Sequence, residues 1–212
     1  RWKGEAAAVY TLNKKLGSKR LATAKTIWLG KKFEDETEIG FPHQFDFRGR
    51  MYPVPAYLNP QGPDLSKALL KFSNSKPLGE VGERYLCIHL ANMYGYDKVP
   101  LQERQQWAMK HKEDIVASSQ SPFTCNFWEQ ADKPWQFLAA CMEFDKFIKH
   151  GRAYECSLPI NIDGSCNGLQ HFSAMLRDEV GGHAVNLTST NNPQDIYQIV
   201  ADKVNLKLKQ SD

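Results

Sequence analysis

Three segments in the middle of the chain repeat apolar residues at helical spacing, namely 80–95, 100–118 and 133–151. Proline stands in the first turn of the second and third segments, and glycine follows the first and the third. Proline is tolerated in a first turn because its missing N–H would have no partner there, and glycine commonly follows a helix end. The pattern therefore predicts three helices.

The two ends of the chain also show helical patterns. Residues 2–33 predict two helices, the first ended by Gly17 and the second capped by Ser18. Residues 192–209 predict a helix with Asn192 as its N-cap and a proline directly after it. The chain thus begins and ends in predicted helix.

Short strand patterns flank the helical middle. Residues 41–58 alternate aromatic and polar positions around a turn at 48–50, which predicts a β-hairpin, and three prolines make it an edge or irregular one. Residues 156–163 predict a short, mainly apolar strand that ends at Asp163, and residues 183–187 predict another.

Two further helices complete the expected elements. Asp64 is placed to cap a short helix over 65–73. A helix over 167–177 would carry its apolar residues on one stripe. Many helices with a few short strands predict an α+β fold.

Composition narrows the class of protein. With 212 residues and 42% apolar content the chain can bury a core, and no apolar run approaches the roughly 18 residues of a membrane helix. The five cysteines show no CxxC pair, which is typical of a reducing compartment and of neither a disulfide framework nor a zinc site. We expect a segment of a longer protein, because the chain starts at Arg1 and stops inside a charged helical pattern.

Charge is distributed unevenly. Residues 1–32 carry nine lysines and arginines against Glu5, whereas the rest of the chain is mildly acidic. A basic segment of this kind suits a polyanion partner, since neutralised phosphates release counterions. A solvated helix face would show the same composition, so charge alone leaves both interpretations open.

Asp163 opens the hexapeptide "DGSCNG" and is the main candidate for chemistry. A calcium loop would use Asp163, Ser165, Asn167 and Gly168 at positions 1, 3, 5 and 6, but position 12 is Ala174 where a bidentate glutamate is required. An aspartate before Gly-Ser can also accept backbone N–H groups of its own turn. The third interpretation is a metal ligand.

The context of Asp163 favours the metal. A carboxylate after a strand, a glycine that lets a ligand approach the backbone, and a helix N-terminus together suit Mg²⁺ and a phosphorylated ligand. Two-metal phosphoryl transfer needs a second carboxylate, and the sequence offers none in a suitable place. Asp46 comes nearest, but Arg48 and Arg50 beside it suit phosphate better than a metal.

Several ordered blocks of the chain resemble one family. "NIDGSCNGLQHFSAMLRDEVGG" is similar to the first palm motif of the single-subunit DNA-dependent RNA polymerases of bacteriophages and mitochondria. "FDFRGRMYPV", "NPQG", "RWKGEAAAVY", "DKVP" and "NPQDIY" follow that family's order and spacing. The resemblance spans essentially the whole chain and is closer to the phage branch.

The resemblance implies roles for six residues. It makes Asp163 a catalytic, metal-binding aspartate and the Gly164 carbonyl oxygen a second ligand of the same magnesium ion. The complete site would hold two Mg²⁺ ions. Gly168 would leave room for a 2′-hydroxyl where related DNA polymerases place glutamate, and Tyr197 would lie near the nucleotide. The remaining two residues, at the hairpin turn, are expected to contact the template and the RNA–DNA hybrid: Arg48, Arg50.

The resemblance also implies an architecture and a reaction. Residues 1–40 would end the thumb, 41–180 would form the first part of the palm, and 181–212 would start the fingers. The family's fingers lysine motif and second metal aspartate are absent from the sequence, so the 212 residues alone are expected to be inactive. The complete enzyme would be a monomer that transfers ribonucleotides from triphosphates on a double-stranded DNA template.

Two matters stay open at this point. A non-catalytic nucleic-acid-binding module with a palm-like shape is the alternative function. The expected location is the host cell cytoplasm for a phage protein and the mitochondrion for a member of the organellar branch, with no membrane partner in either case.

Overall fold

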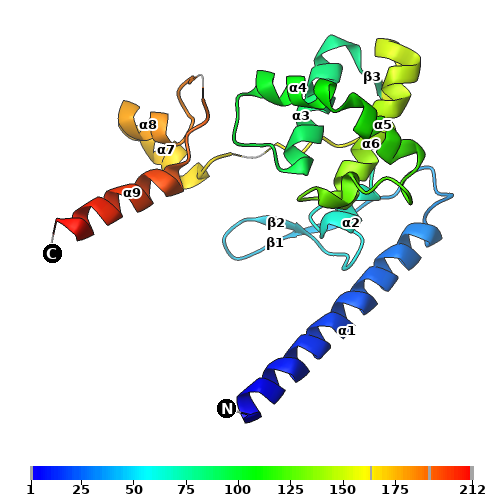
Figure 1. Cartoon of the computed structure of the whole chain (residues 1–212), viewed down its shortest axis with the longest axis horizontal. Coiled ribbons are helices and arrows are strands. Elements are labelled where there is room, and N and C mark those ends of the chain that lie inside the picture. Colours follow the sequence, from blue (N-terminus) through cyan, green and yellow to red (C-terminus); the bar gives the residue numbers. More distant parts are fainter. Residues whose placement is uncertain (1, 163, 191, 211–212) are drawn as a thin grey trace.

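The computed structural model describes residues 2–162, 164–190 and 192–210. These residues are mostly helical with a few short strands, so the predicted α+β class is confirmed. Four helices form a body in the middle of the chain, and Figure 1 shows them packed together. Their bounds are α3 (Gly79–Tyr94), α4 (Leu101–Lys110), α5 (Lys112–Gln120) and α6 (Pro134–His150).

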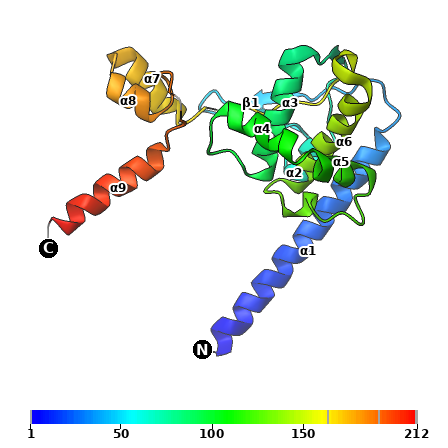
Figure 2. The ribbon, with the colours of Figure 1, turned by 45° about the horizontal axis from the view of Figure 1, so that its top comes forward.

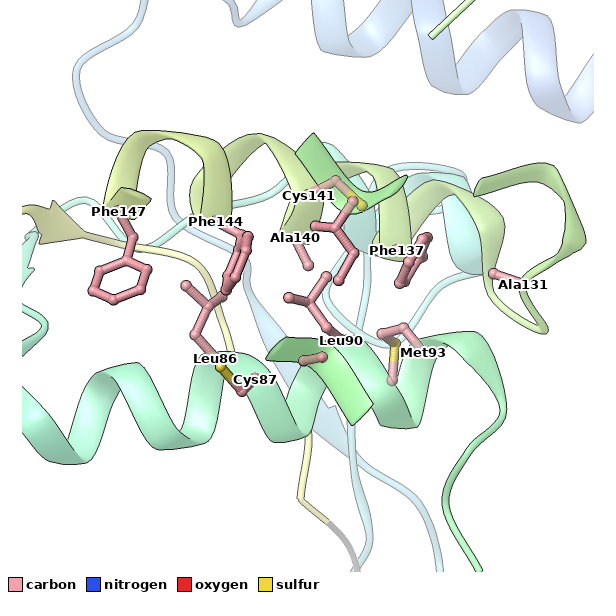
Figure 3. Packing of buried hydrophobic residues seen from close by; sticks show 12 residues of the cluster. Leu86, Cys87, Leu90, Met93, Ala131, Phe137, Ala140, Cys141, Phe144 and Phe147 are labelled. Atoms are coloured by element: carbon pink, nitrogen blue, oxygen red, sulfur yellow. The ribbon is translucent and has the colours of Figure 1, made fainter. Parts of the chain in front are cut away.

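The core of this body lies between α3 and α6. Leu86 and Leu90 on α3 point toward Phe137 and Phe144 on α6, and all four side chains are fully buried (Figure 3). Burying each such side chain stabilises the fold by about 1.5–3 kcal/mol. This packing explains why the helical periodicity of both segments predicted the elements correctly.

Helix boundaries in the body follow local signals with one exception. Gly95 ends α3 in a left-handed conformation with φ of 109°, and Gly151 follows α6 as expected. The single helix predicted over 100–118 is instead two, because the chain leaves helical geometry at His111 between α4 and α5. Two 3₁₀ turns complete this part: Trp128–Gln130 and Gly151–Ala153.

Asp64 caps a different helix from the one that the sequence suggested. It is the first residue of α2 (Asp64–Ala68), which is shorter than the predicted 65–73. Its carboxylate accepts hydrogen bonds from the backbone N–H of Trp135 at 2.9 Å and of Gln136 at 3.1 Å, in the first turn of α6. A residue some seventy positions away thus supplies the acceptors that the start of α6 needs.

A buried carboxylate links α6 to the chain around it. Glu143 is 1% exposed and accepts from Lys71 Nζ at 2.5 Å, Lys146 Nζ at 3.1 Å and the Tyr154 hydroxyl at 2.6 Å. Burial alone would raise the pKa of Glu143, but these donors outweigh it and lower the pKa to about 2. The cluster holds an ionised carboxylate inside the body.

The amino-terminal segment is one helix, α1 (Trp2–Lys32), and not the predicted two. Gly17 and Ser18 lie inside it, because a glycine in a helix interior costs only about 1 kcal/mol and the i to i−4 hydrogen bonds continue through it. Thr26 is its one buried residue within the described chain. Figures 1 and 2 show that the helix projects away from the body, which it meets only near its carboxyl end.

The hairpin prediction is confirmed. β1 (His43–Phe45) pairs antiparallel with β2 (Met51–Pro53), with Phe45 opposite Met51. A second antiparallel pair joins β3 (Lys76–Pro77) to β4 (Glu155–Cys156).

The strand predicted over 156–163 is wrong for its described part. Only Cys156 lies in a strand, and residues 157–162 have no regular structure. A strand needs a ladder of N–H and C=O partners along a neighbour, whereas here the Phe72 N–H donates to the Ser157 carbonyl at 2.9 Å and no described strand pairs with 157–162. This segment is an extended linker between the body and the carboxyl-terminal helices (Figure 1).

Three helices follow the linker, apart from the body, and the first two pack together while the third extends away from them (Figures 1 and 2). The helix predicted over 167–177 is confirmed, but the strand over 183–187 is wrong, because His183 and Ala184 end a helix capped by Asp178. The last helix is capped by Asp195 and not by Asn192. Their bounds are α7 (Asn167–Leu176), α8 (Glu179–Ala184) and α9 (Ile196–Lys209).

Candidate metal and nucleotide site

The motif turn lies at the start of α7. Asp163, the expected catalytic residue, is outside the described residues, so its role stays a prediction that depends on its neighbours. The side of Gly164 that would carry a Cβ faces the ends of two side chains, since a Cβ there would overlap Asn167 Oδ1 and lie 3.2 Å from Gln170 Oε1. Cys166 turns the chain into the helix with a left-handed φ of 59°, a conformation that is uncommon for residues other than glycine.

The Gly164 backbone suits a metal ligand. Among the described residues, no backbone N–H donates to its carbonyl oxygen, and the residue is exposed. Carbonyl and carboxylate oxygens are the ligands that Mg²⁺ prefers. The residues beside Asp163 therefore fit one side of a magnesium site.

The rest of the described chain does not complete such a site. Across residues 2–162, 164–190 and 192–210, no group of three or more His, Cys, Asp or Glu side chains is placed to hold a metal ion. Asp163 lies outside the residues that this finding covers, so the position of a second carboxylate stays a prediction.

Gly168 lies in the first turn of α7 with open space on its side-chain side. A Cβ added there would meet no heavy atom within 4 Å, and the residue needs no left-handed conformation. Neither packing nor backbone geometry among the described residues explains a glycine at this place, although alanine would favour the helix. The open space is compatible with the predicted ribose position.

A network of amide hydrogen bonds joins the motif turn to the start of α9. The Asn186 side chain accepts from the backbone N–H of Gln194 at 2.7 Å and donates to the Gln194 carbonyl at 2.8 Å. Its Nδ2 also lies 3.3 Å from Ser165 Oγ, and Gln170 Nε2 donates to the Val185 carbonyl at 2.8 Å. The turn and α9 therefore share one set of contacts.

Tyr197 lies in the first turn of α9 and its side chain is 73% exposed. Its backbone N–H donates to Asp195 Oδ1 at 3.0 Å, so the N-cap orders the turn that carries it. The exposed ring is available to a ligand.

The two arginines occupy the tip of the β1–β2 hairpin, whose turn is ordered by Asp46. The Asp46 carboxylate accepts from the backbone N–H groups of Arg48 and Arg50 at 2.8 and 3.0 Å, and from the Arg48 guanidinium at 2.9 Å. The Arg50 N–H contributes most to holding the pKa of Asp46 below its usual value, ahead of the Arg48 side chain. Gly49, with φ of 74°, permits the turn.

These contacts distinguish the two arginines. Arg48 is already paired with Asp46, whereas no carboxylate of the described residues lies within ion-pair distance of Arg50. No hydrogen bond or ion pair among these residues joins the hairpin to α7 or α9. The structure thus brings Gly164, Gly168 and the start of α9 together and leaves the arginines on a separate element.

Sequence reasoning missed Asn186. Its neighbours suggested a strand, and nothing at short range marks an asparagine whose partners lie eight and twenty-one positions away. The one local signal is its left-handed φ of 58°, which asparagine tolerates better than most residues but which is visible only in the structure.

No helix in the described part of the chain is long and apolar enough to cross a membrane.

The model of the DNA-dependent RNA polymerase family matches residues 76–212. The DNA-directed RNA polymerase of Enterobacteria phage T3 is 49% identical over 209 residues, which cover 99% of this chain and 24% of the phage protein. T7 RNA polymerase of Escherichia phage T7 is 48% identical over 204 residues, covering 96% of this chain and 23% of that protein.

Organellar relatives are also similar. The mitochondrial DNA-directed RNA polymerase of Neurospora crassa is 42% identical over 206 residues, covering 96% of this chain and 14% of its own length. The chain spans about a quarter of the length of the phage relatives that it matches. Since the family model covers more than half of the chain and the phage proteins match it almost end to end, the chain belongs to the single-subunit DNA-dependent RNA polymerases of the bacteriophage and mitochondrial type, and is more similar to the phage members.

Proposed function

We propose that this chain is the part of a DNA-directed RNA polymerase that carries the first metal-binding aspartate. The reaction is attack of an RNA 3′-hydroxyl on the α-phosphate of a ribonucleoside triphosphate, with release of pyrophosphate. The observation that carries the proposal is the turn at 164–168, where the exposed Gly164 carbonyl has no backbone N–H partner among the described residues and the side-chain side of Gly168 is open. A site for a metal and a ribose needs both properties side by side.

The metal would be held by the Asp163 carboxylate and the Gly164 carbonyl oxygen. Two Mg²⁺ ions, when bound, lower the pKa of the attacking hydroxyl and stabilise the charge on the leaving oxygens. The chain's own residues bind and orient the reactants. Gly168 leaves space beside the sugar, and Tyr197 offers an exposed ring at the start of α9.

The hairpin and α1 supply the contacts to nucleic acid. The Arg50 guanidinium, with no carboxylate partner among the described residues, is available to a phosphate of the template or of the RNA–DNA hybrid, and Arg48 is oriented by Asp46. α1 presents exposed lysines and arginines along a duplex backbone.

The parts of the polymerase follow the elements. Residues 1–40 end the thumb, residues 41–180 form the first part of the palm with the helical body inserted in it, and residues 181–212 start the fingers. The complete enzyme is a monomer, located in the host cytoplasm for a phage enzyme and in the mitochondrion for an organellar one. The 212 residues by themselves would be inactive, because their sequence contains neither the family's fingers lysine motif nor its second metal aspartate.

Asp163→Asn in the complete protein tests the function. The amide is a poor metal ligand but keeps the size of the side chain, so nucleotide addition should fall at least about a thousandfold, as when a group acting on transition-state charge is removed. Binding to a fluorescent template duplex should stay within about twofold, and Asp202→Asn on the exposed face of α9 is the matched control.

Primer extension by the Asp163→Asn protein at the rate of the control would contradict the proposal. Absence of extension by the unmodified complete protein, together with tight template binding, would favour a non-catalytic nucleic-acid-binding module instead.

A further inference from the structure

Asn186 holds two segments of the chain together through its side chain. Its amide makes a pair of hydrogen bonds with the backbone of Gln194, accepting from N at 2.7 Å and donating to O at 2.8 Å. This is the pattern by which one strand residue binds another, supplied here by a side chain. It fixes the segment directly before α9.

The same amide reaches the motif turn. Asn186 Nδ2 lies 3.3 Å from Ser165 Oγ, two residues after Asp163. A second bridge runs parallel to it, since Gln170 on α7 donates to the carbonyl of Val185, which is 1% exposed. Two neighbouring residues, 185 and 186, thus connect the turn and α7 to the start of α9.

Asparagine meets two requirements at this place that other residues do not meet together. Its backbone has φ of 58°, in the region where glycine and asparagine are the common residues. Its amide carries a donor and an acceptor, so it can satisfy both the N–H and the carbonyl of Gln194. Aspartate would place a carboxylate against that carbonyl, and glycine would keep the backbone but lose every side-chain contact.

We propose that Asn186 is a positioning residue of the polymerase site, which sets the turn at 164–166, directly after Asp163 in the sequence, in a fixed relation to Tyr197 on α9. The inference rests on the proposed function. Asn186 acts through Ser165 and Gln194 and contacts neither metal nor nucleotide. Its role is to keep the metal ligands and the nucleotide side of the site in one geometry.

The test uses Asn186→Gly in the complete protein, with Asn192→Gly as the matched control. Asn192 lies in the same segment, is exposed, and its side chain makes no hydrogen bond with the described residues, so both variants add one glycine. The direct readout is the affinity for Mn²⁺ alone, followed by electron paramagnetic resonance of the free ion on the protein–template complex. Asn186→Gly should weaken Mn²⁺ binding about three- to tenfold, the factor that one or two hydrogen bonds supply.

Steady-state kinetics of primer extension give a second measurement, which distinguishes a misplaced site from an unfolded protein. The Mg²⁺ concentration for half-maximal extension and the KM for the nucleotide should rise together by a similar factor, while template affinity and the thermal midpoint match those of Asn192→Gly. Ser165→Ala, which keeps the Asn186–Gln194 pair, should show a smaller change in the same direction. It keeps the proposal testable if Asn186→Gly does not fold.

The results for these variants distinguish failure of the polymerase assignment from failure of the positioning role of Asn186. If Asp163→Asn abolishes extension but Asn186→Gly and Ser165→Ala bind Mn²⁺ like the control, the polymerase assignment stands and the positioning role of Asn186 is overturned. If Asp163→Asn extends primers normally, the assignment of the site is overturned and the inference with it.

Discussion

Replacing Glu143 by glutamine should loosen α6 in a way that depends on pH. The carboxylate is almost completely buried. It accepts hydrogen bonds from Lys71 Nζ at 2.5 Å, Lys146 Nζ at 3.1 Å and the Tyr154 hydroxyl at 2.6 Å. Glutamine keeps the shape and can still accept from the tyrosine. It removes the charge that Lys71 and Lys146 neutralise, and because both lysines donate to Oε1 and the tyrosine to Oε2, an amide whose oxygen accepts from Tyr154 leaves both lysines without an acceptor.

The magnitude follows from the pKa of Glu143. It falls from 4.5 to about 2 on folding, and each unit corresponds to about 1.4 kcal/mol. The ceiling is therefore roughly 3.4 kcal/mol. Both lysine side chains are nearly half exposed, at 43% and 47%. Solvent weakens such pairs, so we expect about 2–3 kcal/mol at pH 7.

The direction of the pKa shift of Glu143 determines the pH range in which the carboxylate stabilises the fold. Because the pKa is depressed in the folded protein, the stabilisation is complete above about 4.5 and is lost as the pH falls toward 2. At pH 4 about 0.8 kcal/mol of it should already be gone, since the unfolded carboxylate is then mostly protonated. The glutamine variant lacks this dependence.

Hydrogen exchange of the α6 amides in the complete protein measures the effect locally. Protection factors should fall roughly 30- to 160-fold in the variant at pH 7, and the gap from the unmodified protein should narrow about fourfold at pH 4. Glu155→Gln is the matched control, because Glu155 is exposed and accepts only from Ser75 in the described chain. A gap that stays constant between pH 7 and pH 4 would refute the reasoning.

Two further predictions concern the site and the hairpin. Gly168→Glu should lower the preference for ribonucleotides over deoxynucleotides by tenfold or more, because the carboxylate fills the open space beside α7. Competition between the two sugars in primer extension measures it, and an unchanged ratio would show that Gly168 does not contact the sugar. Arg50→Ala should reduce the slope of log affinity against log salt for the hybrid by about one. Arg48→Ala should change it less, since Asp46 already holds that guanidinium; equal slopes for all three proteins would make both arginines structural.

The elements that sequence predicted well are those whose boundaries are marked locally. α6 starts at Pro134 and ends before Gly151 as expected, and the hairpin forms around Gly49, because proline and glycine restrict the backbone wherever they occur. α1 shows the limit of such signals. Gly17 does not end the helix, because nothing at that point offers its backbone better partners than the helix itself.

Contacts between residues far apart in the chain could not be predicted from the sequence pattern. Asp64 was expected to cap its own helix and caps α6 instead, and Asn186 was read as part of a strand. Both depend on which backbone groups tertiary packing brings to a carboxylate or an amide. The metal and nucleotide residues came from the resemblance to a family; the structure adds that the Gly164 carbonyl is free of backbone donors among the described residues and that Gly168 faces open space.

The contacts of α1 with the rest of the described chain lie near its carboxyl end, so a small rotation there moves its amino-terminal end a long way. Near its carboxyl end, Lys25 and Thr26 donate to the hydroxyl and the carbonyl of Tyr57 at 3.1 and 3.4 Å, and a Cβ on Gly30 would lie 3.4 Å from Leu69 Cδ1. From Thr26 back to Trp2 the helix extends about 36 Å at 1.5 Å per residue. A rotation of about 10° at Tyr57 therefore carries the far turn through roughly 6 Å, close to one helical turn. The contacts of α1 near its carboxyl end therefore determine where its exposed lysines and arginines can meet a duplex.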